Sequence, residues 1–309
     1  MGNVFAVIKP ILRCLMKVIG MRSKLVEIEP GTTLHFWVPT INSTKPSVVF
    51  LHGFVADGIM TWLFQILSLS SDFAVYVPDL LFFGDSITTR PERSTSFHAH
   101  CLAKGMMKLG VEKFSLVGFS YGGMVGFKLA QLYSHMVESM VMSSTVIEMT
   151  ESISNASLNN IGFTNWPDFL LPKTIAELKV LLSIGSHKFP WFPQFLFRDF
   201  LEQVMFGNRM EKVELLEALV VGDKDATPPK YSQTGTKLEF ICKERWNTND
   251  PLQLPVQEEP NIHHIYDFLE KSFLIDETVR EKILGLTQMY IDLKNNGVTM
   301  VKDKVSLVY

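Results

Sequence analysis

The sequence predicts an α/β protein with a mostly parallel sheet that is covered by helices on both faces. Short segments that are apolar almost throughout alternate with segments whose apolar residues repeat at helical spacing. A strand buried on both faces shows no polar alternation, because neither of its sides meets water. The regular order of strand and helix is typical of the α/β class.

Each predicted element has its own signal in the sequence. Residues 47–54 (SVVFLHGF) are an apolar run that ends at a glycine turn, and residues 73–86 (FAVYVPDLLFFGDS) lead from a strand into a glycine-containing loop. The other predicted strands are residues 114–120 and Met136–Ser144, and the predicted helices between the strands are Ile59–Leu69 and Phe97–Leu109.

A change in sequence character after residue 146 predicts an inserted helical cap over residues 147–230. Strand signals are few between Ile147 and Val221, where helical stretches are broken by prolines and rich in Phe and Trp. Most such rings serve core packing, but a ring-rich helical insertion beside a parallel sheet commonly covers an apolar pocket. The core is therefore expected in two parts, residues 23–146 and 231–309, on either side of the cap.

The first 22 residues predict an amphipathic helix. The apolar residues that share one helical face are Val4, Ile8, Ile11, Leu15 and Ile19, and the basic residues elsewhere on the helix are Lys9, Arg13 and Lys17. The charges interrupt every apolar run, so neither a secretory signal nor a membrane-spanning helix is expected. Two interpretations remain open. The helix packs on its own domain, or it lies on a membrane surface as a cationic amphipathic helix.

Composition narrows the function classes. The chain has 309 residues, 47% of them hydrophobic and 20% charged, which is enough for a large core. A net charge of −3 and the lack of a basic stripe interleaved with aromatics argue against a nucleic-acid partner. The widely spaced cysteines Cys14, Cys101 and Cys242 have no metal-ligand spacing and predict free thiols in a reducing compartment. We therefore expect a cytoplasmic protein, with peripheral membrane contact if the first helix serves as an anchor.

The pattern Gly118-Phe-Ser120-Tyr-Gly122 stands between a predicted strand and a predicted helix, which is the context of a nucleophile elbow. A turn this tight forces the serine into a strained backbone conformation, which is tolerable only where neighbouring side chains are absent. The hydroxyl is then held clear of the sheet at a helix N-terminus, where free N–H groups favour a developing oxyanion. Ser120 is accordingly the predicted nucleophile.

The motif LHGF after the first predicted strand supplies the rest of a predicted oxyanion hole. We assign one donor to the N–H of Phe54 and the other to the N–H of Tyr121, the residue after the predicted nucleophile. His52 is expected to be a structural loop histidine, because the base of a nucleophile-elbow hydrolase comes late in the chain.

The motifs HGF, PDLLFFGDS and GFSYGG, in this order and followed by a helical insertion, resemble the α/β-hydrolase superfamily. The stretches VEIEPGTTLHFWVP, PDLLFFGDS and LLEALVVGDKDATPP resemble, more narrowly, its plant esterase/lipase-like branch over residues 1–232. The resemblance implies the α/β-hydrolase fold and a Ser–Asp–His triad that hydrolyses esters or related acyl substrates without metal or organic cofactor. Serine rather than aspartate at the elbow argues against the dehalogenase and epoxide-hydrolase members.

Two placements of the acid and the base remain open. In the first placement, ALVVGDKDATPP ends a strand, Asp225 is the acid, and His263 or His264 is the base. In the second placement, EKVELLEALVV is a helix that closes the cap, and Glu270 falls where the family's acid sits.

The second placement fits the family's spacing better, but it leaves the triad without a base. Val298 follows Gly297 at the position of the family's histidine, so residues 231–309 form an atypical second part of the core. We therefore expect a serine hydrolase that acts on a small apolar ester or acyl lipid through an acyl-enzyme on Ser120. The alternative is a non-catalytic homologue that binds a ligand in the same pocket without turnover.

Overall fold

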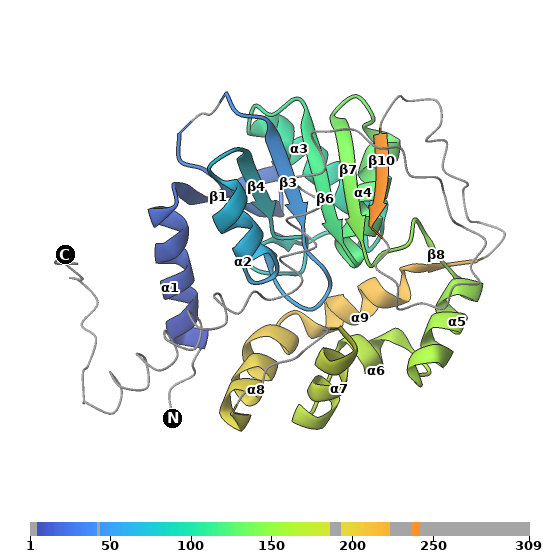
Figure 1. The fold of residues 1–309 in the computed structure, drawn as a ribbon. Coiled ribbons are helices and arrows are strands. Elements are labelled where there is room, and N and C mark those ends of the chain that lie inside the picture. Colours follow the sequence, from blue (N-terminus) through green and yellow to red (C-terminus); the bar gives the residue numbers. More distant parts are fainter. Residues whose placement is uncertain (1–4, 42–43, 186–192, 223–236, 242–309) are drawn as a thin grey trace, which may run out of the picture. The chain divides into compact units, whose positions relative to one another are not determined.

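A computed structural model describes residues 5–41, 44–185, 193–222 and 237–241 of the chain. Its strands are β1 (Met21–Glu29), β2 (Thr32–Pro39), β3 (Ser47–Leu51), β4 (Ala74–Pro78), β5 (Ile87–Thr88), β6 (Phe114–Phe119), β7 (Val137–Ser143), β8 (Met149–Thr150), β9 (Val220–Val221) and β10 (Lys237–Ile241). The main sheet runs in the order β1-β2-β4-β3-β6-β7-β10, with β5 paired to β2 (Figure 1).

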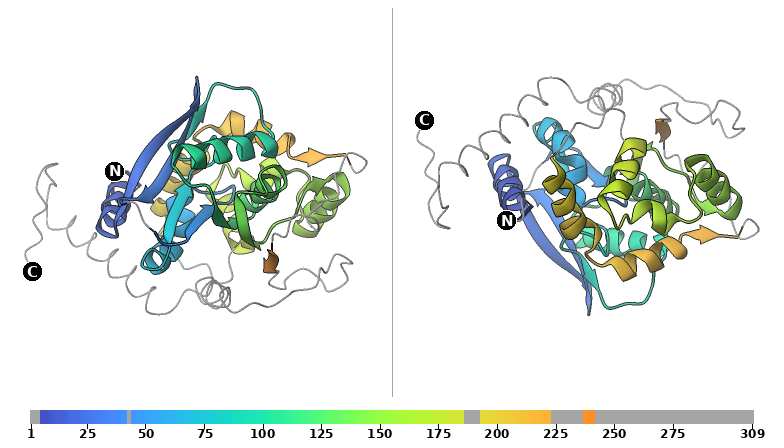
Figure 2. Two further views of the ribbon diagram at one scale, coloured as in Figure 1. Left: turned by 90° about the horizontal axis from the view of Figure 1, so that it is seen from above. Right: turned by 90° about the horizontal axis from the view of Figure 1, so that it is seen from below.

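The helices occupy the connections between these strands. They are α1 (Phe5–Val18), α2 (Gly58–Leu69), α3 (Thr95–Lys108), α4 (Tyr121–Leu132), α5 (Glu151–Ile161), α6 (Trp166–Leu170), α7 (Ile175–Gly185), α8 (Gln194–Phe200), the π-helix η1 (Leu201–Met205) and α9 (Arg209–Glu217). Helix α2 covers one face of the sheet, and α3, which packs against α4, covers the other (Figures 1 and 2). The predicted fold class, a mostly parallel sheet with helices on both faces, is confirmed.

Strands β4, β3, β6, β7 and β10 pair in parallel, whereas β1 and β2 form an antiparallel hairpin. The central strands are apolar throughout, as the side chains of Val48, Val49 and Phe50 in β3 illustrate, because each is buried on both faces. The hairpin β1–β2 was not among the predicted strands. The outer strand of the hairpin, β1, has no continuous apolar run, and Leu25 in its middle is 61% exposed.

Helix α4 approaches the sheet unusually closely. A side chain at Gly122 would meet the backbone carbonyls of Leu51 and His52 at the end of β3. A side chain at Gly118 would lie 2.7 Å from the Cα of Gly123, where backbone cannot give way. The two glycines that flank Ser120 therefore allow the strand, the turn and the helix to meet within van der Waals contact.

The segments between β7 and β10 form a helical layer beyond the carboxyl ends of the strands (Figure 1). Side chains from α6, α7, α8 and η1 make its own small apolar cluster: Phe169, Leu178, Leu181, Phe197, Leu201 and Met205. Leu215 and Leu216 of α9 pack instead into the main core cluster, and Glu214 pairs with Arg93 of the core at 2.9 Å. Helix α9 and the end of α6, whose Leu171 belongs to the same main cluster, thus pack this layer onto the sheet. The predicted cap limits at residues 147 and 230 stay predictions.

The segment before Asp225 bears on the two triad placements. Residues Arg209–Glu217 are helical, and Val220–Val221 pair with β8 in a separate two-stranded sheet. The strand beside β7 in the main sheet is β10, which neither placement predicted. The strand that the first placement expects before Asp225 therefore lies outside the main sheet. The helix of the second placement is present only as far as Glu217, because Val220 and Val221 are in a strand.

Helix α1 packs its own domain with one side and exposes the other. Met16 is fully buried, with Leu12 and Leu15 half-buried beside it. Ile11, which the sequence placed on the apolar face of this helix, is 45% exposed, because the side that packs on the domain is centred on Leu12 and Met16. No helix in the described part of the chain combines the length and the apolar character needed to cross a bilayer. Contact of α1 with a membrane surface stays a prediction.

Replacement of Gly122 by Ala should destabilise the protein by about 1–3 kcal/mol, because the new Cβ meets backbone carbonyls that cannot move aside. Urea denaturation followed by circular dichroism measures this loss. Gly185→Ala is the matched control, since Gly185 is an exposed helical residue with nothing within 4 Å of an added Cβ. Equal stability of the two variants would show that the close approach of α4 does not constrain the fold.

Candidate active site

Ser120 occupies the turn between β6 and α4 with φ 52° and ψ −121°. This left-handed φ is strained for a residue with a side chain and costs on the order of 1–3 kcal/mol. The N–H of Ser120 donates to the carbonyl of Ser143 at 2.9 Å, and its own carbonyl accepts from the N–H of Gly123 at 2.9 Å. Neighbouring backbone on both sides therefore holds the strain in place. The side chain is partly exposed at the N-terminus of α4.

The loop after β3 lies directly beside this turn. A Cβ at Gly53 would come within 3.4 Å of the Cβ of Ser120, so the loop backbone and the serine are in contact. Phe54 follows Gly53, and its ring packs edge-on against Tyr121, with the ring centroids 5.9 Å apart. As the first residue of α4, Tyr121 has an N–H without a carbonyl acceptor inside the helix. The two residues predicted as oxyanion donors thus flank the serine.

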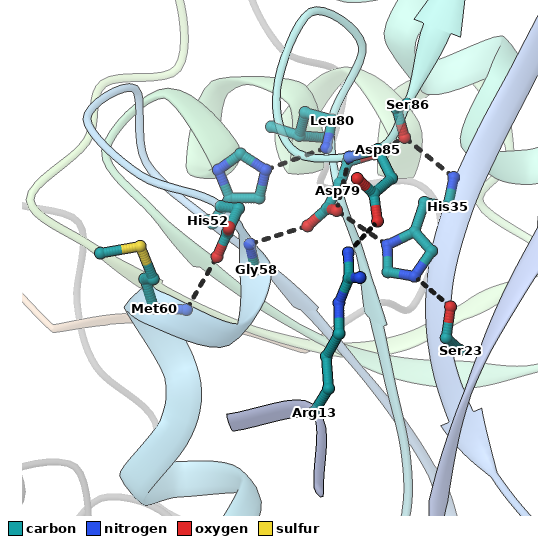
Figure 3. Close-up of polar contacts among 11 residues, drawn as sticks. Arg13, Ser23, His35, His52, Gly58, Met60, Asp79, Leu80, Asp85 and Ser86 are labelled. Atoms are coloured by element: carbon teal, nitrogen blue, oxygen red, sulfur yellow. Dashed lines mark hydrogen bonds and ion pairs between the residues drawn. The ribbon is translucent and has the colours of Figure 1, made fainter. Parts of the chain in front are cut away.

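His52 is held by the backbone on both ring nitrogens. Its Nδ1–H donates to the carbonyl of Gly53 at 2.7 Å. Its Nε2 accepts the N–H of Leu80 at 2.9 Å, which Figure 3 shows. Burial is the main reason why the pKa of His52 lies below its ordinary value. A neutral ring with both nitrogens occupied cannot accept the proton of Ser120. His52 instead fixes the shape of the loop that contains Phe54.

No histidine among the residues that the structure describes forms a hydrogen bond with Ser120 Oγ. His35 and His52 bond to other groups, and the nitrogens of the buried His98 have no hydrogen-bond partner in the described part. The predicted acids and bases, Asp225, His263, His264 and Glu270, and the position of Val298, lie outside the described residues. Whether a base reaches Ser120 is therefore decided by residues outside the described part, and the two placements of the acid and the base stay predictions.

A buried aromatic cluster lies behind the serine. The rings of Phe54, Phe83 and Tyr121 pack edge-on or tilted, and His98 contacts Tyr121 with the ring centroids 5.6 Å apart. Burial lowers the pKa of His98 to about 3 and raises the pKa of Tyr121. Both side chains are therefore uncharged at neutral pH. They act as packing surfaces for the helix that presents Ser120.

A hydrogen-bonded series of Ser, His and Asp side chains lies elsewhere in the core (Figure 3). Ser23 Oγ lies 2.8 Å from His35 Nε2, and His35 Nδ1 lies 2.8 Å from Asp79 Oδ2. Because a carboxylate can only accept, His35 carries its proton on Nδ1. Ser23 belongs to the exposed side of the outermost strand β1, so this serine is separate from the elbow. No pattern in the sequence predicts the series, because its members come from three separate strands or strand ends.

Asp79 has further partners that define its role. Its carboxylate accepts the N–H of Gly58 at 2.9 Å and the N–H of Asp85 at 3.2 Å. Burial alone would raise the pKa of Asp79, but the bonds from His35 and Gly58 hold it below the ordinary value. The ionised carboxylate therefore ties the β1–β2 hairpin, the start of α2 and the loop after β4 together. We assign the series a structural role, as the tie between these segments.

Among the residues described, no group of three or more His, Cys, Asp and Glu side chains is placed to hold a metal ion. The structure describes Cys14 as an exposed and Cys101 as a buried free thiol. Burial raises the pKa of Cys101 to about 12, so this thiol is not a nucleophile at neutral pH.

Comparison with known proteins gives one family match and several more distant ones. The family model described as alpha/beta hydrolase fold matches residues 46–205. Epoxide hydrolase 4 of Homo sapiens is 26% identical over 176 residues, which cover 55% of this chain and 42% of that protein. The matches span only 21–42% of the length of such curated relatives.

Two solved structures illustrate the likeness in fold. A bacterial membrane phospholipase A has a TM-score of 0.62 at 20% identity, covering 77% of this chain and 73% of that one. The 2-hydroxy-6-oxo-6-phenylhexa-2,4-dienoate hydrolase of Rhodococcus sp. strain RHA1 has a TM-score of 0.58 at 19% identity, covering 71% and 80% of the two chains. At these identities the likeness extends to the fold alone.

Replacement of Asp79 by Ala should cost about 3–5 kcal/mol of stability, because it leaves the buried His35 and two backbone N–H groups without their acceptor. Urea denaturation at pH 7 measures the loss. Asp72→Ala provides the matched control, since Asp72 is exposed and its removal should change stability by no more than about 0.5 kcal/mol. A small effect at both positions would mean that Asp79 does not tie the segments together.

Proposed function

The chain belongs to the α/β-hydrolase fold family, and from this premise we propose that it is a serine hydrolase that cleaves a small apolar ester or acyl lipid through an acyl-enzyme on Ser120. The observation that carries the proposal is the backbone of Ser120, a strained and partly exposed residue between a buried strand and a glycine-rich helix. Strain at a residue with no packing role is typical of a position kept for chemistry.

The proposed reaction has two steps. Ser120 Oγ attacks the ester carbonyl carbon while a base takes its proton, and the amides of Phe54 and Tyr121 stabilise the oxygen that becomes negative. The tetrahedral intermediate expels the alcohol, which leaves with the proton from the base. Water then attacks the acyl-enzyme in the same manner and releases the acid.

The identity of the elbow residue favours esters over epoxides. A relative of this chain is named an epoxide hydrolase, but the epoxide-hydrolase and dehalogenase members of the superfamily have aspartate at the elbow. An aspartate attacks through a carboxylate that needs no deprotonation, whereas a serine needs a base. Ser120 therefore supports acyl transfer, with the base supplied by His263 or His264.

A second candidate is a homologue that binds an acyl ligand without turnover. The observation that favours it is the lack of any histidine bonded to Ser120 Oγ in the described part of the chain. Without a base, a triad hydrolase loses about six decades of rate and keeps only oxyanion stabilisation and binding. The two candidates differ in one measurable property, which is the reactivity of Ser120.

Wild-type protein should react covalently with a fluorophosphonate probe, and Ser120→Ala should abolish the labelling, because only a serine activated by a base attacks phosphorus. Labelling is measured by in-gel fluorescence and the modified residue by peptide mass spectrometry. Ser23→Ala is the matched control, since Ser23 also lies against a histidine but has been assigned a structural role. It should label like wild type.

Loss of labelling in Ser23→Ala but not in Ser120→Ala would move the nucleophile to the series of Ser23, His35 and Asp79. A folded wild-type protein that does not label at all would favour the ligand-binding candidate.

Hydrolysis of p-nitrophenyl acetate should fall by about 10³-fold or more in either His263→Ala or His264→Ala, because removal of the base leaves the serine unactivated. The other of the two variants serves as the control and should retain activity within a few-fold of wild type. Asp225→Asn and Glu270→Gln, measured in the same assay, separate the two candidate acids. Unchanged rates in both histidine variants would exclude these residues as the base.

A further inference from the structure

A cavity of about 80 Å³ lies between the loops of the core and the helical layer. Its walls come from the loop after β3, the loop after β4 and the segment from η1 to α9; the residues used below are Val55, Asp57, Phe83, Asn208, Lys212 and, from α1, Lys9. A single water needs only about 10–15 Å³ in this measure, so the cavity has room for a small organic group. We name it the Lys212 cavity.

The most unusual side chain in this wall is Lys212 of α9. Its residue is only 6% exposed, and its Nζ donates to the carbonyl of Val204 at 3.0 Å. The ammonium also lies 5.0 Å from the centroid of the Phe83 ring. Within the described ranges no carboxylate oxygen lies within 4.0 Å of Lys212 Nζ. Among the described residues, the carbonyl of Val204 is the acceptor that Lys212 Nζ meets, and no carboxylate pairs with it, although a buried charge normally has an opposite partner.

The rest of the wall leaves a surplus of positive charge. Lys9 is a second cation, and Asp57 is the acid in the wall. The carboxylate of Asp57 already accepts the N–H of Met60 at 2.9 Å as the N-cap of α2. Burial and the nearby Asp79 raise the pKa of Asp57 to about 6, so its negative charge is mostly present at pH 7 and is lost as the pH falls through 6. Burial lowers the pKa of Lys212 to about 8, so that its ammonium remains mostly charged at pH 7.

The cavity adjoins the candidate active site through two shared residues. Val55 in its wall follows Phe54, one of the proposed oxyanion donors. Phe83 contacts Lys212 on one side and the ring of Phe54 on the other, with the two ring centroids 5.1 Å apart. The cavity therefore lies next to the loop that contains one proposed oxyanion donor, on the far side of the Phe83 ring from Phe54.

We propose that the Lys212 cavity binds a carboxylate at the far end of the substrate, with Lys212 as its principal cation and the Asn208 side chain beside it. The substrate class is then an ester of short apolar chain that ends in a carboxylate, such as a half-ester of a dicarboxylic acid. The inference rests on the proposed function for its catalytic readout, but binding of the carboxylate itself does not need a reactive serine.

The test compares hydrolysis of mono-p-nitrophenyl glutarate, which carries the carboxylate, with hydrolysis of p-nitrophenyl butyrate, which does not. Wild type should prefer the glutarate ester, and Lys212→Met should lower kcat/KM for it at least 10-fold while changing the butyrate ester less than about 3-fold. Lys212→Arg should keep most of the preference, because it retains the charge. An equal loss on both esters, or no loss on either, overturns the proposal.

If Lys212→Met does not fold, Lys9→Met provides a second test of the same cavity. Lys9 also lines the cavity but is only half-buried, so its replacement disturbs the fold less. It should reduce the preference about 3-fold, whereas Lys17→Met, an exposed lysine of the same helix that does not line the cavity, should leave it unchanged. Identical preferences in these two variants contradict the proposal.

A binding measurement separates failure of this proposal from failure of the proposed function. Isothermal titration of glutarate into Ser120→Ala should show binding, and the double variant with Lys212→Met should show at least 10-fold weaker binding. If wild type hydrolyses neither ester but Ser120→Ala binds glutarate through Lys212, the carboxylate site is supported and the proposed hydrolase function is contradicted. Absence of glutarate binding together with no ester preference in wild type removes the cavity from consideration.

Discussion

The close approach of α4 to the ends of β3 and β6 is the constraint on which the candidate site depends. Gly122 lies against the carbonyls of Leu51 and His52, where no side chain fits. With α4 this close to the sheet, the chain has to turn from β6 into α4 within one residue. That residue is Ser120, which adopts a positive φ. The same packing brings Gly53 into contact with the serine, and with it the loop that contains the proposed oxyanion donor. Strain, exposure and the position of the loop are therefore consequences of one contact between backbones.

The carboxylate of Asp79 couples the loops around this contact. It binds the first residue of α2, the backbone of Asp85 and the ring of His35, which come from segments far apart in the sequence. A buried charge is stable only while such partners stay in place, so none of these segments can move without leaving donors unpaired. Residues 55–57 and 82–84, which line the Lys212 cavity, directly precede Gly58 and Asp85, whose backbones are bonded to Asp79. The wall of the cavity on the side of the core is therefore held in place.

The sequence predicts the parts of this structure whose signals are local. The strands β3, β4, β6 and β7 and the helices α2 and α3 lie within the predicted segments or within two residues of them, because an apolar run and a helical repeat are visible in a short window. Ser120 could be located for the same reason, since its glycine spacing is local. The series of His35 and Asp79 and the burial of Lys212 could not be predicted, because their partners lie in other segments of the chain. Ile11 shares the apolar face that periodicity predicts and is nevertheless exposed, because periodicity fixes a helical stripe only to within one neighbouring position.

The pairing of β8 with β9 has a consequence for how this protein can change over evolution. Met149–Thr150 and Val220–Val221 run side by side, so the helical segment between them begins and ends at neighbouring points. A segment whose two ends are adjacent can lengthen, shorten or be exchanged without altering the path of the chain outside it. Recombination at these two strands would therefore give new helical layers to the same serine-bearing sheet, with Leu171, Leu215 and Leu216 as the side chains that each replacement has to match.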